Sequence, residues 1–310
     1  MSYEGKMLKD LKMPSRREIE AALLKSLFWH NGVIKEFGSG EEIVDELADD
    51  FNLNGEQRTA QLETIYRKEN RLKKSSLWHR LLFRAADSLA KEKLIIRPTQ
   101  TFELTNKREW MLSETGFNKA LHLLKIPREL KYSLSTKSYE VQKVVKKLKE
   151  SPRPENYNPF HSEKKLVKVT KETSLRARGF RQAVIEAYDF QCAVCKMKLN
   201  SPDFILWEAE AAHIVPHNAL GKDDIWNGIS LCRLHHWAFD VGWFTLLADY
   251  SIMISTRFNS LPSDFGKMGN YDFIRELANN NSKIYLPNTG KMFPHPNSLR
   301  WHRNNIFFKE

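Results

Sequence analysis

The chain has 310 residues, of which 41% are hydrophobic and 11% aromatic, and its formal net charge is +11. This length allows two domains of ordinary size, and this composition is that of a folded globular protein and excludes a disordered chain. No stretch approaches the roughly 20 apolar residues that span a bilayer, and the N-terminus lacks the apolar run of a signal peptide, so we expect a cytosolic protein with no membrane partner.

Residues 1–127 alternate helical patterns with one short β segment. Pro14-Ser15 begins a helix with apolar residues at helical spacing, and Ser39-Gly40-Glu41-Glu42 opens a second helix. A polar helical stretch follows Gly55, and residues 76–92 form a strong amphipathic helix. Two short strand-like runs lie within residues 94–104 around a Pro-containing turn, and a further helix begins after Leu112-Ser113-Glu114. Helices followed by a β-hairpin are the element order of a winged helix-turn-helix.

The stretch from Glu42 through LWHRLLFRAADSLAKEKLI to FELTNKREWMLSETGFNKAL also resembles the Mrr-type winged-helix domain at the front of restriction endonucleases. This resemblance implies that residues 76–92 are a recognition helix that faces double-stranded DNA, with Arg97 on the wing. The side chains that would contact DNA are Lys73, Lys74, His79, Arg80, Arg84 and Arg97. The alternatives are a solvated helix face and a protein-interaction module.

Residues 128–175 form a basic connector. From Arg128 to Arg181 there are 15 Lys and Arg against 6 Asp and Glu, a net charge of +9. The segment YEVQKVVKKLKE fits one short amphipathic helix, and the proline-rich segment after it reads as a linker. A segment of this charge favours a polyanion, most commonly nucleic acid, although it would also suit a solvated connector.

All three cysteines belong to two knuckles, Cys192-x-x-Cys195 and Cys232-x-x-His235, which are about 36 residues apart. Two such pairs can close a tetrahedron around one zinc ion, and cysteines of a cytosolic protein are more often metal ligands than disulfide partners. We therefore predict that Cys192, Cys195, Cys232 and His235 bind a structural zinc. Buried thiols without a metal are the alternative.

The residues between and after the knuckles include further candidates for a functional site. A strand is expected to end at His213, Asn227-Gly228 begins the next turn, and a helix carries the Cys232-x-x-His235 pair and His236. The AHIVP strand, the Asn five residues before the second knuckle and the CxxHH helix start resemble the HNH, or ββα-metal, nuclease fold. FRQAVIEAYDFQCAVC and LPNTGKMFPHPNSLRWHRNNIFF resemble its restriction-type subfamily, so the resemblance covers roughly residues 179–308.

The resemblance implies hydrolysis of DNA phosphodiester bonds to 5′-phosphate and 3′-hydroxyl ends. A neutral imidazole suits a general base at cellular pH, and we assign this role to His213. His236 would bind a catalytic divalent ion, Mg²⁺ or Mn²⁺, which neutralises charge on phosphate oxygens. Asn227 would orient the strand or loop of His213 or touch the metal, and Arg233 is a phosphate clamp or a solvated side chain.

One position departs from the family pattern. Many members have Asp directly before the base as a second metal ligand, and this chain has Ala212. Glu210, Asp240 or another nearby group then supplies the oxygen ligand, or a single protein ligand and waters hold the ion, or the site has lost activity. We expect His217 to be an ordinary loop histidine, with contact to a phosphate as the alternative. We expect the aromatic cluster of Trp237, Phe239, Trp243 and Phe244 to be core around the zinc helix, with a platform that stacks bases as the alternative.

We therefore predict an α+β protein with a winged helix-turn-helix over residues 1–127, a basic linker over 128–175 and a zinc-bound HNH nuclease domain over 176–310. The winged helix would read a DNA site or a modified base. Duplex cleavage needs two cuts, so one active site per chain suggests a homodimer. The alternative function is that of a non-catalytic DNA-binding regulator with a structural zinc domain.

Overall fold

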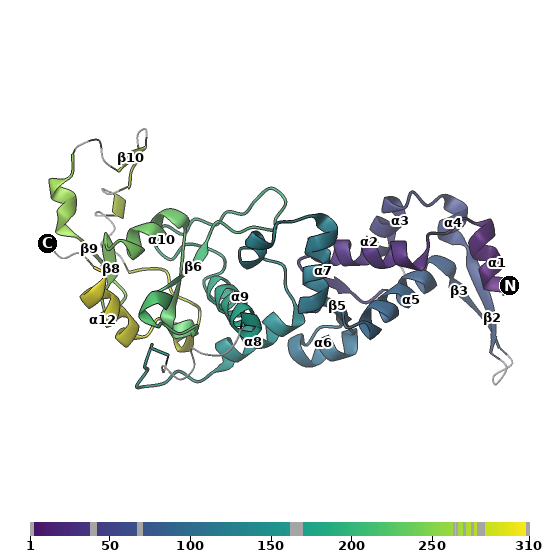
Figure 1. Ribbon diagram of the computed structural model, residues 1–310, viewed down its shortest axis with the longest axis horizontal. Helices are drawn as coiled ribbons and strands as arrows, with labels where there is room; N and C mark the ends of the chain where they lie inside the picture. Colours follow the sequence, from purple (N-terminus) through teal and green to yellow (C-terminus); the bar gives the residue numbers. More distant parts are fainter. Residues whose placement is uncertain are drawn as a thin grey trace. The chain divides into compact units, whose positions relative to one another are not determined.

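The structure is a computed structural model that describes residues 3–37, 42–66, 71–161, 170–262, 264, 266–268, 271–273, 276–277 and 283–307 (Figure 1). The chain divides into two compact units, one of Met1–Lys131 and Ser135–Gln142 and the other of Tyr132–Leu134 and Lys143–Glu310. This division falls inside the stretch that the sequence predicts as a linker. Among the described residues, no helix has the length and apolar character needed to cross a bilayer.

The first unit is mainly helical. Its elements in chain order are α1 (Tyr3–Asp10), α2 (Arg16–Trp29), β1 (Val33–Lys35), α3 (Glu42–Asp50), α4 (Gly55–Thr59), β2 (Gln61–Tyr66), β3 (Arg71–Ser76), α5 (Leu77–Lys91), β4 (Ile95–Ile96), α6 (Pro98–Thr105), β5 (Glu109–Leu112) and α7 (Glu114–Leu124). A 3₁₀ turn (Arg128–Tyr132) and α8 (Tyr139–Glu150) follow. The predicted helix opening at residues 39–41 lies outside the described residues.

Serine caps set the starts of the three helices that form the core of this unit. The hydroxyls of Ser15, Ser76 and Ser113 accept hydrogen bonds from backbone N–H groups in the first turns of α2, α5 and α7. Helix α2 packs against both α5 and α7. Their apolar stripes are buried at the contact, as the helical spacing in the sequence predicts, and they include Leu23, Leu27, Leu82 and Phe117.

The predicted strand pair within residues 94–104 is wrong in its second half. Only Ile95–Ile96 is a strand, and residues 98–105 form helix α6, because Pro98 at the first helical position has the φ angle of a helix. The buried Thr101 hydroxyl ties this helix to the carbonyl oxygen of Glu109. The partner of β4 is therefore β5, and the sheet order is β1-β5-β4, with both pairings antiparallel.

The polar stretch after Gly55 is also not a single helix. It contains the short helix α4 and the antiparallel hairpin β2–β3, in which Gln61 pairs with Ser76 and Leu62 with Ser75. Leu62 is buried between the exposed Gln61 and Glu63, which is the alternation of a strand with one covered face. A run this polar has too few apolar positions to distinguish the helical period of 3.6 residues from the strand period of two residues in the sequence.

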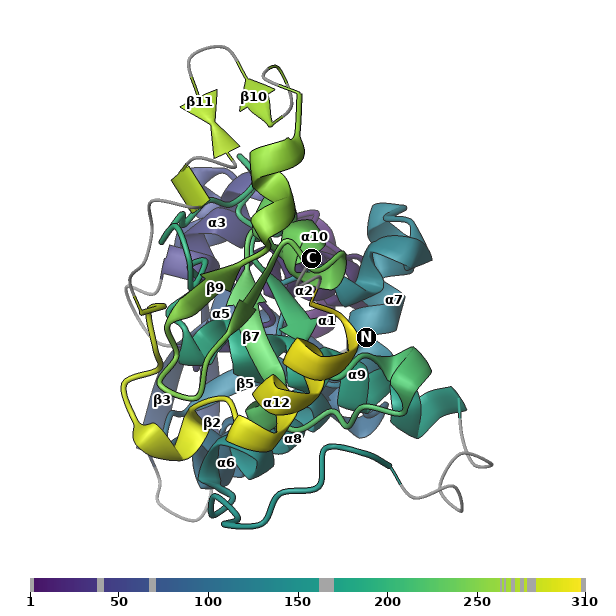
Figure 2. The same cartoon turned by 90° about the vertical axis from the view of Figure 1, so that its left-hand side faces the viewer.

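The second unit contains α9 (Thr170–Ala187), β6 (Glu210–His213), β7 (Gly228–Leu231), α10 (Arg233–Asp240), β8 (Phe244–Leu246), β9 (Ile252–Ile254), β10 (Lys267–Met268), β11 (Tyr271–Asp272) and α12 (Pro296–Asn305). Short 3₁₀ helices lie at His217–Ala219, Ile225–Asn227, Thr256–Ser260 and Gly290–Met292. The helix Thr256–Ser260 is labelled η5. The antiparallel hairpin β6–β7 packs against both α9 and α10 (Figure 1). The hairpin β8–β9 follows α10, and α12 packs on β8 (Figure 2).

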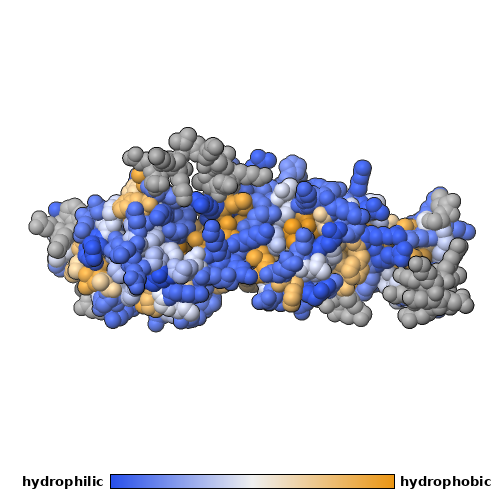
Figure 3. All heavy atoms as spheres, turned by 90° about the horizontal axis from the view of Figure 1, so that it is seen from below, coloured by the Kyte–Doolittle hydropathy of each residue, from blue (hydrophilic) through white to orange (hydrophobic). Residues whose placement is uncertain are grey.

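The face of the molecule in Figure 3 is largely hydrophilic, with hydrophobic residues in separate patches. This distribution agrees with the 28% of charged residues in the sequence. Apolar patches on such a surface are informative because they interrupt an otherwise solvated exterior.

A buried neutral histidine makes the stability of the second unit depend on pH. His302 of α12 donates through Nε2 to the carbonyl oxygen of Phe239, 3.1 Å away, and accepts at Nδ1 from the Thr245 hydroxyl, 2.9 Å away. Its ring stacks on Phe239 with centroids 3.6 Å apart. Burial lowers the pKa of His302 to about 4, below its unfolded value of about 6.5.

Because the folded-state pKa is depressed, the stabilisation is present above about pH 6.5 and is lost as the pH falls toward 4. We expect the free energy of unfolding of the wild type to fall between pH 7 and pH 5 by about 2 kcal/mol more than that of His302→Gln. Denaturant titrations at several pH values measure both slopes. Loss of zinc affects the two proteins alike, so parallel slopes would contradict this assignment.

Candidate functional site

Three thiols and one imidazole gather at the start of α10. Cys192 and Cys195 lie in a tight turn closed by a backbone hydrogen bond from Lys196 to Cys192, and Cys232 is the N-cap residue of α10, one turn before His235. Three of these four residues are buried, and Cys195 is exposed. The ligand atoms of all four lie within 4.8 Å of one another.

The distances fit one tetrahedral ion. The Sγ atoms of Cys195 and Cys232 are 3.9 Å apart, and Sγ of Cys192 lies 3.8 Å from Nδ1 of His235. Zn–S bonds of about 2.3 Å place two sulfurs of a tetrahedron about 3.8 Å apart. Hydrogen bonds with Cys192 and then Cys232 lower the pKa of Cys195 to about 3, so a thiolate is favoured among these thiols. The donor set therefore suits zinc, with no position left for a reacting water.

His213 ends strand β6, and its ring is held on two sides. It stacks on Phe180 of α9 with centroids 4.1 Å apart, and its Nε2 lies 2.9 Å from Oδ1 of Asp223. Burial lowers the pKa of His213, and the charges of His217 and His236 lower it further, against the raising effect of Asp223. His213 is therefore neutral at cellular pH. Because Nε2 faces an ionised carboxylate, Nε2 carries the proton and Nδ1 is the basic nitrogen.

Asp223 is a site residue that the sequence analysis missed. Burial raises its pKa, but the hydrogen bonds from His213 and His217 outweigh burial and hold the pKa well below its usual range. His217 is not an ordinary loop histidine, since its Nε2 lies 3.2 Å from the same oxygen, and this hydrogen bond raises its pKa. Asp223 follows His213 by ten residues in an irregular loop, so no helical or strand spacing connects the two in the sequence.

Asn227 fixes the loop that carries His217 and Asp223. Its side chain is fully buried, accepts from the backbone N–H of Val215 at 2.9 Å, and donates to the carbonyl oxygens of Val215 and Lys222 at 2.9 and 3.0 Å. Gly221 lies against this clamp, because a Cβ there would clash with the Val215 carbonyl oxygen. All of these bonds go to backbone, so the side chain of Asn227 holds the loop that follows His213.

His236 lies between two carboxylates. Its Nδ1 is 2.8 Å from Oε2 of Glu210, and its Nε2 is 3.4 Å from Oδ2 of Asp240. Burial lowers the pKa of His236, but the Glu210 hydrogen bond and the charges of Asp240 and Glu210 outweigh it, and the net shift is upward. The hydrogen bond from His236 lowers the pKa of Glu210. Position 212 is a fully buried alanine, and Glu210 and Asp240 are the carboxylates paired with His236 among the described residues.

The two histidine clusters share one electrostatic environment. His236 acts on the pKa of His213. Both rings also lower the pKa of Asp240, but burial outweighs them and the net shift of that pKa is upward. The strand β6 carries Glu210 at one end and His213 at the other, and α10 packs against this strand. Arg233 at the start of α10 lies 3.4 Å from Glu210, and its side chain is largely exposed to solvent.

The cations that the sequence assigns to DNA contact in the first unit mostly have acidic neighbours. Arg80 lies 3.5 Å from Glu4 of α1, and Arg84 forms an ion pair with the same carboxylate. Lys74 is 3.0 Å from Glu63. His79 is half-buried in the first turn of α5, and the side chain of Lys73 lies outside the described residues.

Arg97 is not on a hairpin wing. It is the N-cap residue of α6, and its guanidinium lies 2.5 Å from Asp87 of α5. This placement follows from the helix that replaces the second predicted strand. Its cation is therefore tied to the recognition-helix candidate by an ion pair and is not carried on a separate loop.

Residues 192–247 match the family model of the HNH endonucleases. This segment holds the four zinc-type donors together with His213, Asp223, Asn227, His236 and Asp240. The second unit therefore contains a domain that matches the HNH endonucleases. The expectation of an HNH domain in this part of the chain is confirmed.

Among solved structures, the chain is similar to a modification-dependent TagI restriction endonuclease, with 17% sequence identity and a TM-score of 0.31. The similarity covers 45% of this chain and 44% of that chain, so this protein spans less than half of that enzyme's length. No curated protein matches this sequence.

Removal of one thiol tests the zinc assignment. We expect Cys192→Ser to lose bound zinc and to unfold the second unit, because binding of a structural zinc contributes about 10 kcal/mol or more to folding. Metal analysis of the purified chain and its thermal unfolding with and without a chelator measure the two effects. Lys196→Ser, which changes the same turn without removing a donor, is the matched control. A fully folded, zinc-free Cys192→Ser protein would falsify the assignment.

Proposed function

We propose that this protein is a restriction-type endonuclease that hydrolyses DNA phosphodiester bonds with a divalent metal ion, with His213 as general base. The observation that carries the proposal is the pairing of a neutral, oriented imidazole with a second cluster rich in oxygen donors. His213 is buried against Phe180 and held by Asp223, and His236, Glu210 and Asp240 lie in the same electrostatic environment.

His213 would take the proton of the attacking water at Nδ1. Its lowered pKa keeps this nitrogen unprotonated at cellular pH, and the Asp223 carboxylate at Nε2 fixes the tautomer and stabilises the imidazolium that forms. Phe180 and Asp223 together prevent rotation of the ring. The same proton can then pass to bulk solvent, since His213 is not fully buried.

The donors around His236 would suit a hard divalent ion. Glu210 faces Nδ1 of His236, and these two residues would hold the ion, whereas Asp240 faces the opposite ring nitrogen, Nε2. Oxygen and nitrogen donors of this kind suit Mg²⁺ or Mn²⁺. When bound, the ion supplies positive charge for the phosphate and leaving-group oxygens. Glu210 thus takes the place of the Asp that many family members have at the position of Ala212. Arg233 adds a fixed positive charge beside Glu210.

The Cys192, Cys195, Cys232 and His235 cluster would bind a structural zinc that holds the first turn of α10. Because His236 directly follows His235, an ion at this cluster would also determine where His236 lies. Asn227 performs the corresponding task for the loop that carries Asp223. Each catalytic imidazole would therefore have its own rigid support.

We also propose that the first unit is a winged helix that reads a DNA site or a modified base. The order α2, β1, α3, α5, β4, β5 and the sheet order β1-β5-β4 support it, with α4 and β2–β3 inserted before α5. Helix α5 would be the recognition helix. Contact of Arg80 and Arg84 with phosphates would then require that they exchange Glu4 for DNA. Cleavage of both strands would use a homodimer.

Loss of the base tests the proposed chemistry. We expect the wild type to cut long genomic DNA in the presence of Mg²⁺ or Mn²⁺. Cutting is expected on at least one of two forms of this DNA, the unmodified form or the form with modified bases. His213→Ala should be at least about 100-fold slower, because the attacking water loses its proton acceptor. Gel assays with sequencing of the ends measure the rate and the termini.

His122→Ala, which removes an exposed histidine of α7 in the other unit, is the matched control and should cut at the wild-type rate. Equal activity of His213→Ala and wild type, or absence of cutting on every form of DNA, would count against the proposal.

Removal of the metal-side imidazole should separate binding from turnover. We expect His236→Ala to lose cleavage by about 100-fold or more while the dissociation constant for DNA stays within a few-fold, because phosphate contacts elsewhere supply most of the affinity. Calorimetric titration with Mn²⁺ should show weakened binding of one ion per chain in the variant. Unchanged Mn²⁺ affinity would remove His236 from the metal site.

A further inference from the structure

Helix α10 has a second functional face beside the one that carries His236. His236 and Asp240 are four residues apart and form one stripe, and Trp237 and Val241 form the next stripe, about 100° round the helix. Leu234 lies one turn before Trp237. The exposed fractions of Leu234, Trp237 and Val241 are 39%, 53% and 48%. An apolar stripe of this kind on a nuclease helix is unusual for a surface that only contacts water.

The sequence expectation of a single aromatic core is therefore only half right. Phe239 and Phe244 are fully buried, with ring centroids 5.4 Å apart. Trp237 and Trp243 are not part of this core, because Trp237 is exposed and Trp243 is half-buried. The helical period decides this outcome, since Trp237 and Phe239 are two residues apart and project from different sides of α10.

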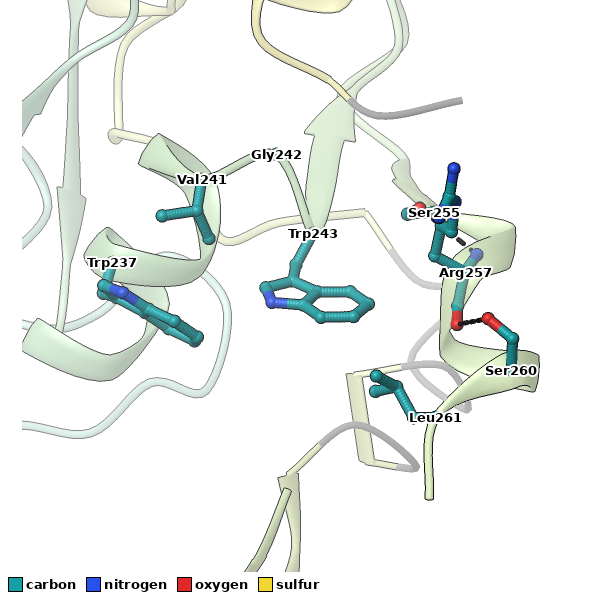
Figure 4. Close-up of a pocket in the computed structure, with 8 residues that line it drawn as sticks. All are labelled: Trp237, Val241, Gly242, Trp243, Ser255, Arg257, Ser260 and Leu261. Atoms are coloured by element: carbon teal, nitrogen blue, oxygen red, sulfur yellow. Dashed lines mark hydrogen bonds between the residues drawn. The ribbon is translucent and has the colours of Figure 1, made fainter. Parts of the chain in front are cut away.

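Trp237 and Trp243 line one cavity of about 450 Å³. Val241 lies between them, and Leu261 and Arg257 face them from η5 and the residue after it (Figure 4). A cavity of this size is within the range of small-ligand pockets, about 300–1,000 Å³. Its walls combine two indole rings with one guanidinium.

The cavity is held open by backbone contacts. Ser255 donates its backbone N–H to the carbonyl oxygen of Trp243 at 2.9 Å, which joins the two walls. The Ser255 hydroxyl caps η5 by accepting from the backbone N–H of Arg257, and the Ser260 hydroxyl donates to the Arg257 carbonyl oxygen at 2.8 Å. Gly242, with φ of +82°, makes the turn that brings Trp243 back beside Trp237. The walls therefore do not depend on a ligand for their shape.

We propose that this cavity binds an unstacked nucleobase of the DNA, close to the phosphodiester bond that is cut. The inference rests on the proposed function, because that function places the DNA backbone at the neighbouring stripe of α10. Indole faces stack any base, and such stacking contributes several-fold to over 100-fold in affinity per base. Arg257 adds positive charge, which suits a polyanionic strand. A base inside an intact duplex is covered on both faces, so the occupant is a base that has left the stack.

An oligonucleotide pair separates stacking from charge. One probe is oligothymidylate of about ten nucleotides, within the usual length that a single-strand groove covers, and the other is the same backbone with abasic residues at every position. Binding to the full chain is measured by anisotropy with Ca²⁺ in place of Mg²⁺, and the integrity of both probes is checked on gels. We expect Trp237→Ala to weaken binding of the thymidylate by about 10-fold and to leave the abasic probe unchanged.

Two further variants complete the test. Trp237→Phe retains an aromatic face and should keep most of the affinity for thymidylate. Trp29→Ala removes another exposed indole, which is 48% exposed in the first unit, and should have no effect. Equal loss for both probes, or no loss for either, would overturn the proposal. The proposal would also be overturned if sedimentation showed a dimeric wild type and a monomeric Trp237→Ala variant while the affinities for both probes stayed unchanged. The stripe would then be a contact between two copies of the chain.

DNA cleavage by the same preparations distinguishes this proposal from the proposed function. If the wild type cuts DNA but its preference for thymidylate over the abasic probe does not depend on Trp237, the pocket assignment fails and the nuclease assignment stands. If that preference depends on Trp237 and no DNA is cut, the nuclease assignment fails and the pocket assignment stands.

Discussion

The convergence of Cys192, Cys195, Cys232 and His235 at the first turn of α10 is the constraint on which the nuclease unit depends. This helix is only eight residues long, and a helix of that length is marginal without tertiary support. Both of its outward stripes, one with His236 and one with Trp237, take their positions from this short helix. A small rotation of α10 would therefore displace the imidazole of His236 and the aromatic pocket together.

The surroundings of His213 and His236 shift the pKa values of the two imidazoles in opposite directions. Burial keeps His213 neutral, whereas the carboxylates around His236 raise its pKa, so the two rings favour opposite protonation states in the same environment. A neutral ring can accept a proton, and a ring among carboxylates belongs to a set of donors that attracts a cation. Asp223 and Glu210 are the residues that produce this difference. The division of roles thus follows from which carboxylate each ring contacts.

The inward and outward side chains around α10 have different roles. Inward positions such as Phe239 and His302 stack at 3.6 Å and form the core. Outward positions such as Trp237 leave apolar surface in water, which costs stability unless another molecule covers it. An exposed indole directly after His236 is consistent with the DNA contact that we propose for the aromatic pocket.

From the sequence alone, the zinc-type knuckles, the strand that ends at His213, the helix that carries His236 and the serine-capped helices of the first unit could be predicted. These features are local, because each depends on spacing within a few residues or on a cap beside an apolar stripe. Helix α6 and the β2–β3 hairpin could not be predicted, since Pro98 and a polar run are compatible with more than one backbone conformation. Only the tertiary structure decided that Asp223 and His217 meet His213 and that Glu210 meets His236. Those contacts join residues from loops, strands and helices, and a linear pattern contains no information about which of them face one another in space.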